Sequence, residues 1–105
     1  MVQSTSNWSC GVASVMDIFG GKWKLNILWR ISQHEGLGFN QLKREVEGIT
    51  NIMLTRAIKT LVAENLIIRK ELKVTPPRTE YYLTASAKSL LPIMAALNEW
   101  GKDNL

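Results

Sequence analysis

The sequence predicts one mainly α domain of the α+β class, in which five helices accompany a single two-stranded β-hairpin. The chain has 105 residues, which is room for one domain, and 46% of them are hydrophobic, as in a packed globular protein. Apolar residues recur at helical spacing in five segments. Two β-rich runs, residues 66–70 and 79–83, flank a turn that contains adjacent prolines. These three observations together indicate the fold class.

The first two predicted helices are separated by a glycine pair. The first runs from Val12 to Phe19 and ends where Gly20-Gly21 interrupts its apolar pattern. Residues 22–31 resume the pattern with apolar side chains on more than one face, so this helix is central or is shared with a partner subunit. We expect residues 1–9 to form a flexible segment ahead of a domain that spans residues 10–105.

The next two helices are short and closely spaced. Residues 39–46 form the first, with Phe39, Leu42 and Val46 pointing inward, and Glu47-Gly48 closes it. Residues 51–64 form the second, for which Thr50 is the N-cap: its hydroxyl can accept a hydrogen bond from the amide of Ile52 or Met53. The stripe expected to point inward comprises Leu54, Ala57, Ile58, Leu61 and Val62.

A hairpin and a long helix complete the chain. Asn65 tolerates the left-handed backbone of a helix end, and the two β runs then enclose a turn at residues 73–78 with a basic tip. Thr84 is the N-cap of the last helix. Within that helix, Pro92 predicts either a kink or the true first turn.

Two short helices joined by a tight turn and followed at once by a hairpin are the order of a winged helix-turn-helix. The second helix of this unit can enter the major groove of DNA, and the hairpin, or wing, can reach the backbone or the minor groove. The net charge of +4 favours an anionic partner, since residues 22–50 carry +2 and residues 51–85 carry +3. The expected DNA-contacting residues are Asn40, Lys43, Thr50, Asn51, Ile52, Thr55, Arg56, Lys59, Lys70, Lys73 and Arg78.

These side chains have the chemistry that DNA recognition needs. Arg56 can pair with guanine through two hydrogen bonds and Asn51 with adenine, and Lys59 can bind guanine or a phosphate. Lys70, Lys73 and Arg78 of the wing would bind phosphates.

Several short motifs add a family resemblance. They include Gly20-Gly21-Lys22-Trp23, Pro76-Pro77-Arg78 and Trp100-Gly101, and with shorter matches they span residues 10–101. In this combination the chain resembles the HxlR-type transcriptional regulators. The resemblance implies a small DNA-binding protein that acts as a homodimer on an inverted repeat. The chain departs from the family pattern at several positions, namely Gly11, Ile52, Ala57, Asn65 and Ala87, so its target sequence is not expected to be that of a relative.

Dimerisation is also expected on physical grounds, because two-fold dimers bind two half-sites one helical turn apart. Candidate interface residues lie on the first and last helices: Val12, Val15, Phe19, Leu91, Met94, Ala95, Leu97, Asn98 and Trp100. The alternative for each is ordinary core packing.

Cys10 is the single cysteine, so an intramolecular disulfide is excluded and a reducing compartment is the default. No signal peptide and no apolar segment of membrane-spanning length are visible, and we expect a cytoplasmic protein without a membrane partner. The family resemblance implies a further role, because some relatives sense oxidants or electrophiles through a cysteine at this position. The alternative is an incidental thiol.

Other functional classes find little support in the sequence. One His, one Cys and the lack of a Gly-rich phosphate loop or of metal-ligand spacing argue against an enzyme, a cofactor and a metal site. The remaining alternative is a winged helix that contacts only proteins, without specific DNA binding. That alternative predicts that the outer face of residues 51–63 tolerates loss of its charge.

Overall fold

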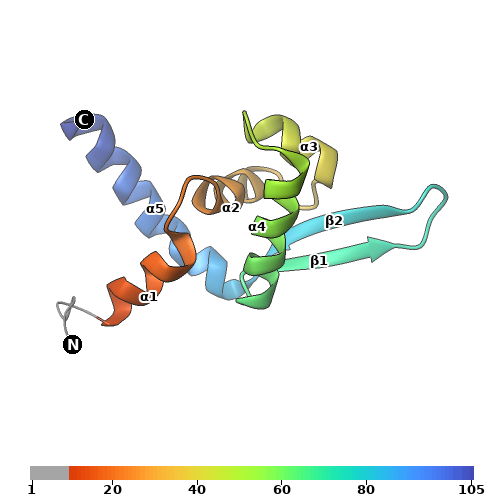
Figure 1. The fold of residues 1–105 in the computed structure, drawn as a ribbon, viewed down its shortest axis with the longest axis horizontal. Helices are drawn as coiled ribbons and strands as arrows, with labels where there is room; N and C mark the ends of the chain where they lie inside the picture. Colours follow the sequence, from red (N-terminus) through yellow and green to blue (C-terminus); the bar gives the residue numbers. More distant parts are fainter. Residues whose placement is uncertain (1–9) are drawn as a thin grey trace.

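The computed structural model describes residues 10–105, which form five helices and one two-stranded antiparallel sheet (Figure 1). The predicted fold class is confirmed. The segment expected to be flexible, residues 1–9, lies outside the described residues. The elements are α1 (Cys10–Phe19), α2 (Lys24–Gln33), α3 (Phe39–Glu45), α4 (Asn51–Ala63), β1 (Ile67–Leu72), β2 (Arg78–Leu83) and α5 (Ala85–Asn104).

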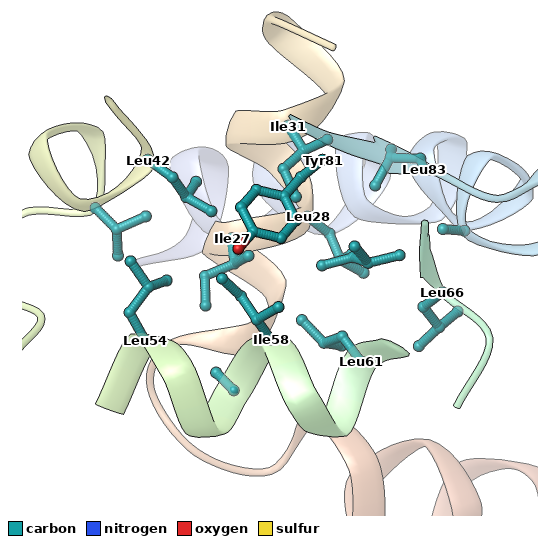
Figure 2. Close-up of a cluster of buried hydrophobic side chains, with 14 of the residues drawn as sticks. Ile27, Leu28, Ile31, Leu42, Leu54, Ile58, Leu61, Leu66, Tyr81 and Leu83 are labelled. Atoms are coloured by element: carbon teal, nitrogen blue, oxygen red, sulfur yellow. The ribbon is translucent and has the colours of Figure 1, made fainter. Parts of the chain in front are cut away.

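Helix α2 lies at the centre of the core. Its residues Ile27, Leu28 and Ile31 have no exposed surface. Figure 2 shows these side chains facing those of α4 on one side and Tyr81 and Leu83 of β2 on another. Burial of one such aliphatic side chain contributes about 1.5–3 kcal/mol. The helix-turn-helix and the wing are therefore held against the same central helix.

The wing is attached to the core at its base. Strands β1 and β2 pair from Ile67↔Leu83 at the base to Leu72↔Arg78 near the tip. Ile67 and Leu83 are buried, whereas the tip, residues 73–77, is exposed to solvent. Only the end nearest to α4 is thus fixed by packing.

The loop between α2 and α3 pairs with β2. The amide of Gly36 donates to the carbonyl of Tyr81 at 2.9 Å, and the amide of Tyr81 donates to the carbonyl of Leu37 at 3.1 Å. Gly36 has φ +90°, and a Cβ at this position would lie 3.0 Å from the hydroxyl of Tyr82. Glycine is therefore required where the loop approaches the wing.

Thr84 joins three elements. Its hydroxyl accepts a hydrogen bond from the amide of Ala87 at 3.1 Å, as the N-cap prediction requires, and donates to the carbonyl of Asn65 at 2.8 Å. Asn65 has φ +60°, the left-handed backbone expected at the end of α4. The end of α4, the start of β1 and the start of α5 therefore meet at one side chain.

Three details differ from the sequence predictions. Val62 is 39% exposed rather than inward, because it stands at the edge of the apolar stripe of α4 and borders an open groove beside Arg69 and Tyr81. Pro92 lies inside α5, which begins at Ala85, so the proline does not mark the first turn. Phe19 belongs to the core of the single chain and is only 9% exposed, so its side chain is not free for a partner.

Candidate nucleic-acid interface

Helix α4 has one buried face and one exposed face. Leu54 and Leu61 have no exposed surface, and Ala57 and Ile58 are buried beside them. The opposite face carries the four exposed polar and basic residues that the sequence analysis selected: Asn51, Thr55, Arg56 and Lys59. An α-helix with its side chains is about 10–12 Å in diameter and so fits a major groove about 12 Å wide.

An apolar residue lies within this polar face. Ile52 is 64% exposed, which is unusual for isoleucine. An aliphatic side chain on a groove-facing helix can contact the methyl group of thymine. Ile52 therefore fits the predicted face in position and in chemistry.

The start of α4 is fixed by a side-chain cap and by the preceding turn. The hydroxyl of Thr50 accepts a hydrogen bond from the amide of Met53 at 3.1 Å, which confirms one of the two predicted donors. Gly48 adopts φ +90° in the turn from α3, and a Cβ there would lie 3.6 Å from the ring of Trp23. Trp23 thus packs beside the turn of the helix-turn-helix.

Helix α3 contributes the two other predicted residues. Asn40 is exposed near its start, whereas Lys43 is half-buried in its last turn. Both lie on the helix that precedes α4 and packs with it against α2. Of the two side chains, that of Asn40 is the more exposed to solvent.

The wing carries exposed cations and two carboxylates that partly neutralise them. Lys70, Lys73 and Arg78 are exposed, but the guanidinium of Arg78 lies 3.2 Å from a carboxylate oxygen of Glu80. The hydroxyl of Tyr82 donates to the other oxygen of Glu80 at 2.7 Å. This hydrogen bond, assisted by Arg78 and Lys70, lowers the pKa of Glu80 below its ordinary value of 4.5.

Arg69 is paired in the same way. Its guanidinium lies 2.9 Å from Glu71 on the same strand. Of the wing cations, Lys70 and Lys73 are therefore the ones without a carboxylate partner among the described ion pairs.

The structure also places side by side some basic residues that were not expected from the sequence to form one surface. Lys22 and Lys24, from the turn before α2 and its first residue, line a groove of about 240 Å³ with Arg56 of α4. The local charge of residues 22–50 was visible in the sequence. Its position beside α4 was not, because it depends on how α2 packs.

The candidate dimer residues lie at the end of the molecule opposite the wing, on α1 and α5 (Figure 1). Val12 and Val15 are 37% and 45% exposed, and Leu97 and Trp100 are 57% and 58% exposed. Ala95 and Asn98 are exposed as well, whereas Leu91 and Met94 are half-buried. Apart from Phe19, these side chains retain accessible surface in the single chain.

Two other features are absent from the described part of the chain. Residues 10–105 contain no group of three or more His, Cys, Asp or Glu side chains that could hold a metal ion. None of the helices in the same range is long and apolar enough to cross a membrane.

Comparison with known families decides the classification. The model of the HxlR-like helix-turn-helix family matches residues 18–105. The chain belongs to this family. As an HxlR-like protein it is a winged helix-turn-helix transcriptional regulator that binds DNA, and the resemblance inferred from the sequence motifs is confirmed.

Two relatives illustrate how much of the HxlR-like chain is shared. A protein of Fusobacterium mortiferum assigned as the regulatory protein MalR is 35% identical over 103 residues, which are 98% of this chain and 97% of the relative. An uncharacterised HTH-type transcriptional regulator of Halalkalibacterium halodurans is 40% identical over 89 residues, which are 85% of this chain and 79% of the relative.

Solved structures share the fold of this HxlR-like protein. A structure from Porphyromonas gingivalis W83, assigned to the MarR family of transcriptional regulators, has a TM-score of 0.84 and 35% identity, and the match covers 98% of this chain and 100% of that one. The redox regulator HypR in its oxidised form has a TM-score of 0.82 and 33% identity, with 91% and 98% covered.

Cys10 is exposed at the first residue of α1 in this HxlR-like chain. It lies on the helix that carries Val12 and Val15, and its sulfur forms no disulfide within the chain. The thiol is therefore accessible to reagents in the single chain.

Proposed function

We propose that this protein is a sequence-specific transcriptional regulator that binds an inverted-repeat operator as a homodimer. The observation that carries the proposal is the exposed outer face of α4, where Asn51, Thr55, Arg56 and Lys59 project away from the core. Placed in the major groove, these side chains reach base edges.

When α4 lies in the major groove, the wing increases the affinity for DNA without distinguishing one base sequence from another. Lys70 and Lys73 bind phosphates of the adjacent backbone, and Arg78 does so in competition with Glu80. Phosphate contacts of this kind release counterions, so binding weakens as salt rises.

Two copies joined through α1 and α5 supply two such units. The exposed apolar side chains of Val15, Leu97 and Trp100 favour burial against a second copy, since removal of apolar surface from water is favourable. A two-fold axis at that end places the two α4 helices on half-sites related by inversion, about 34 Å apart.

The test of DNA binding is fluorescence anisotropy with genomic fragments selected by the protein. The variant Arg56→Ala/Lys59→Ala removes two outer-face cations that take part in no ion pair within residues 10–105, so folding should be unaffected. We expect it to lower operator affinity by about 2–6 kcal/mol per half-site if both cations bind bases.

Lys88→Gln/Lys102→Gln is the matched control, because it removes the same charge from α5 and leaves the outer face of α4 unchanged. Operator binding by the control should stay close to wild type. No binding by the wild type at low salt, or equal binding by the Arg56 and Lys59 variant, would sink the DNA-recognition proposal and leave the protein-contact alternative.

Cys10 supports a second, regulatory proposal: oxidants or electrophiles modify its thiol and thereby change DNA affinity. The support is the exposed sulfur at the start of α1, next to the proposed dimer surface, together with the likeness to the redox regulator HypR. Oxidation can join two Cys10 side chains across the dimer, and an electrophile can form an adduct with one.

Diamide treatment followed by anisotropy tests this regulatory proposal. We expect the operator affinity of the wild type to change by tenfold or more, about 1.4 kcal/mol, and to return with dithiothreitol. Cys10→Ser should be insensitive to diamide. Equal responses of the two proteins would remove Cys10 from the mechanism.

A further inference from the structure

A second basic surface lies on the side of α4 away from the wing. Its groove, of about 240 Å³, is formed by the turn between α1 and α2 and by one edge of α4. The lining residues that carry charge are Lys22, Lys24 and Arg56, and the lining contains no carboxylate. None of these residues belongs to the wing.

The two edges of α4 are bordered differently. Thr55 and Lys59 line the groove that α4 shares with Arg69 and Tyr81 of the wing strands. Met53, Arg56 and Thr60 line the groove that α4 shares with the α1–α2 turn. The outer face of α4 therefore lies between the wing on one side and the lysines of this turn on the other.

Packing holds the turn beside the helix-turn-helix. Trp23 packs against the core, and its ring lies beside Gly48 in the turn between α3 and α4. The ammonium of Lys22 lies over that same ring, 4.9 Å from its centroid. The position of Lys22 is thus set relative to the start of α4 rather than left to a free loop.

The charge of this groove is not neutralised within the described part of the chain. Lys22, Lys24 and Arg56 take part in none of the ion pairs among residues 10–105, whereas Arg69 and Arg78 of the wing are each paired with a glutamate. Three like charges around one groove repel each other. An anion in the groove removes that repulsion.

We propose that Lys22 and Lys24, beside the base-contacting Arg56, bind a backbone phosphate of the same DNA duplex that α4 enters. This inference rests on the proposed DNA binding and adds a contact on the strand opposite the one that the wing follows. Arg56 connects the two surfaces, since it belongs both to the outer face of α4 and to the groove. The duplex is then held by its backbone on both sides of the recognition helix.

The salt dependence of binding tests this directly and does not require a known operator. A fluorescein-labelled duplex of mixed sequence, about 30 base pairs long, covers two half-sites. We expect Lys22→Gln/Lys24→Gln to reduce the slope of log K against log salt by about 0.9 for each phosphate that the variant no longer neutralises. At 0.1 M salt this corresponds to about eightfold weaker binding per phosphate.

Two further variants sharpen the result. Lys22→Arg/Lys24→Arg keeps the charge and should keep the wild-type slope. Lys88→Gln/Lys102→Gln removes equal charge from residues paired with Glu35 and Glu99, and its slope should also match the wild type. On a selected operator, the ratio of operator to mixed-sequence affinity should be unchanged by the glutamine substitutions, because phosphate contacts carry no sequence information.

The two proposals fail in different ways. If the glutamine variant has the slope of the Lys88 and Lys102 control while the wild type binds DNA, the groove is not a phosphate site and the proposed function stands. If the wild type does not bind the duplex at low salt, both proposals are overturned. As a control, the thermal unfolding midpoint of each variant is compared with that of the wild type, and equal midpoints show that weaker binding does not come from loss of the fold.

Discussion

Glu80 is one of the two glutamates that reduce the positive charge of the wing. Its carboxylate accepts from Tyr82 and pairs with Arg78, and the hydrogen bond from Tyr82 is the largest cause of its lowered pKa. The same hydrogen bond raises the pKa of Tyr82. Glu80 therefore interacts with two neighbours on β2, and its ion pair with Arg78 competes with any contact between Arg78 and a DNA phosphate.

A pH series tests this network. Because the pKa of Glu80 is lower in the folded chain than its ordinary 4.5, its ionised form contributes stability above that pH, and the contribution is lost as pH falls through the lowered value. We expect Glu80→Gln to unfold at lower urea concentration than the wild type at about pH 7, and the two midpoints to converge as the pH falls through the lowered pKa of Glu80. A difference that is the same at every pH would contradict this account.

At the scale of single elements, local signals in the sequence were sufficient where a local interaction decides the structure. Thr50 and Thr84 cap α4 and α5 as predicted, because a hydroxyl reaches an amide three residues ahead whatever the rest of the fold does. The left-handed Asn65 is a similar case. Helical periodicity likewise placed the exposed side chains of α4, since a buried stripe fixes the opposite face.

Features that depend on packing between distant segments could not be predicted. Periodicity assigns Val62 to the apolar stripe, but only the position of the wing determines that it borders an open groove. Phe19 has the spacing of an interface residue and is instead used by the core. Glu35 gave no signal, yet it accepts from the amide of Leu83 at 2.7 Å and pairs with Lys88 at 3.4 Å.

At the scale of the molecule, exposed apolar side chains occur along α1 and α5, which reach the end opposite the wing (Figure 1). Trp29 of α2 borders a groove of about 360 Å³ with Met94 and Leu97 of α5, and Leu97 and Trp100 are more than half exposed. These residues lie where the proposed second copy would bind. Of the two alternatives expected for α2, the central position is confirmed, and whether the helix is also shared with a partner stays a prediction.

The oligomeric state is the corresponding measurement. We expect Leu97→Asp/Trp100→Asp to shift the molar mass in light scattering from twice the chain mass to the chain mass, because two carboxylates would be buried without partners in the proposed dimer. The fold should persist, since both side chains are exposed in the single chain. Val74→Asp, on the exposed wing tip, is the control and should remain dimeric.

A monomeric wild type would contradict the proposed assembly. The assembly would also be contradicted if Leu97→Asp/Trp100→Asp had the same dimeric molar mass as the Val74→Asp control.

The hydroxyl of Thr84 has a mechanical consequence. Through it the carbonyl of Asn65, two residues after the end of α4, is bonded to the residue that caps α5, so one side chain links the end of the recognition helix to the start of the helix of the proposed dimer surface. A signal that changes the angle between two α5 helices would swing both recognition helices without altering either. We expect such a signal to change the distance between half-sites that the protein can span, rather than its preference for bases within each half-site.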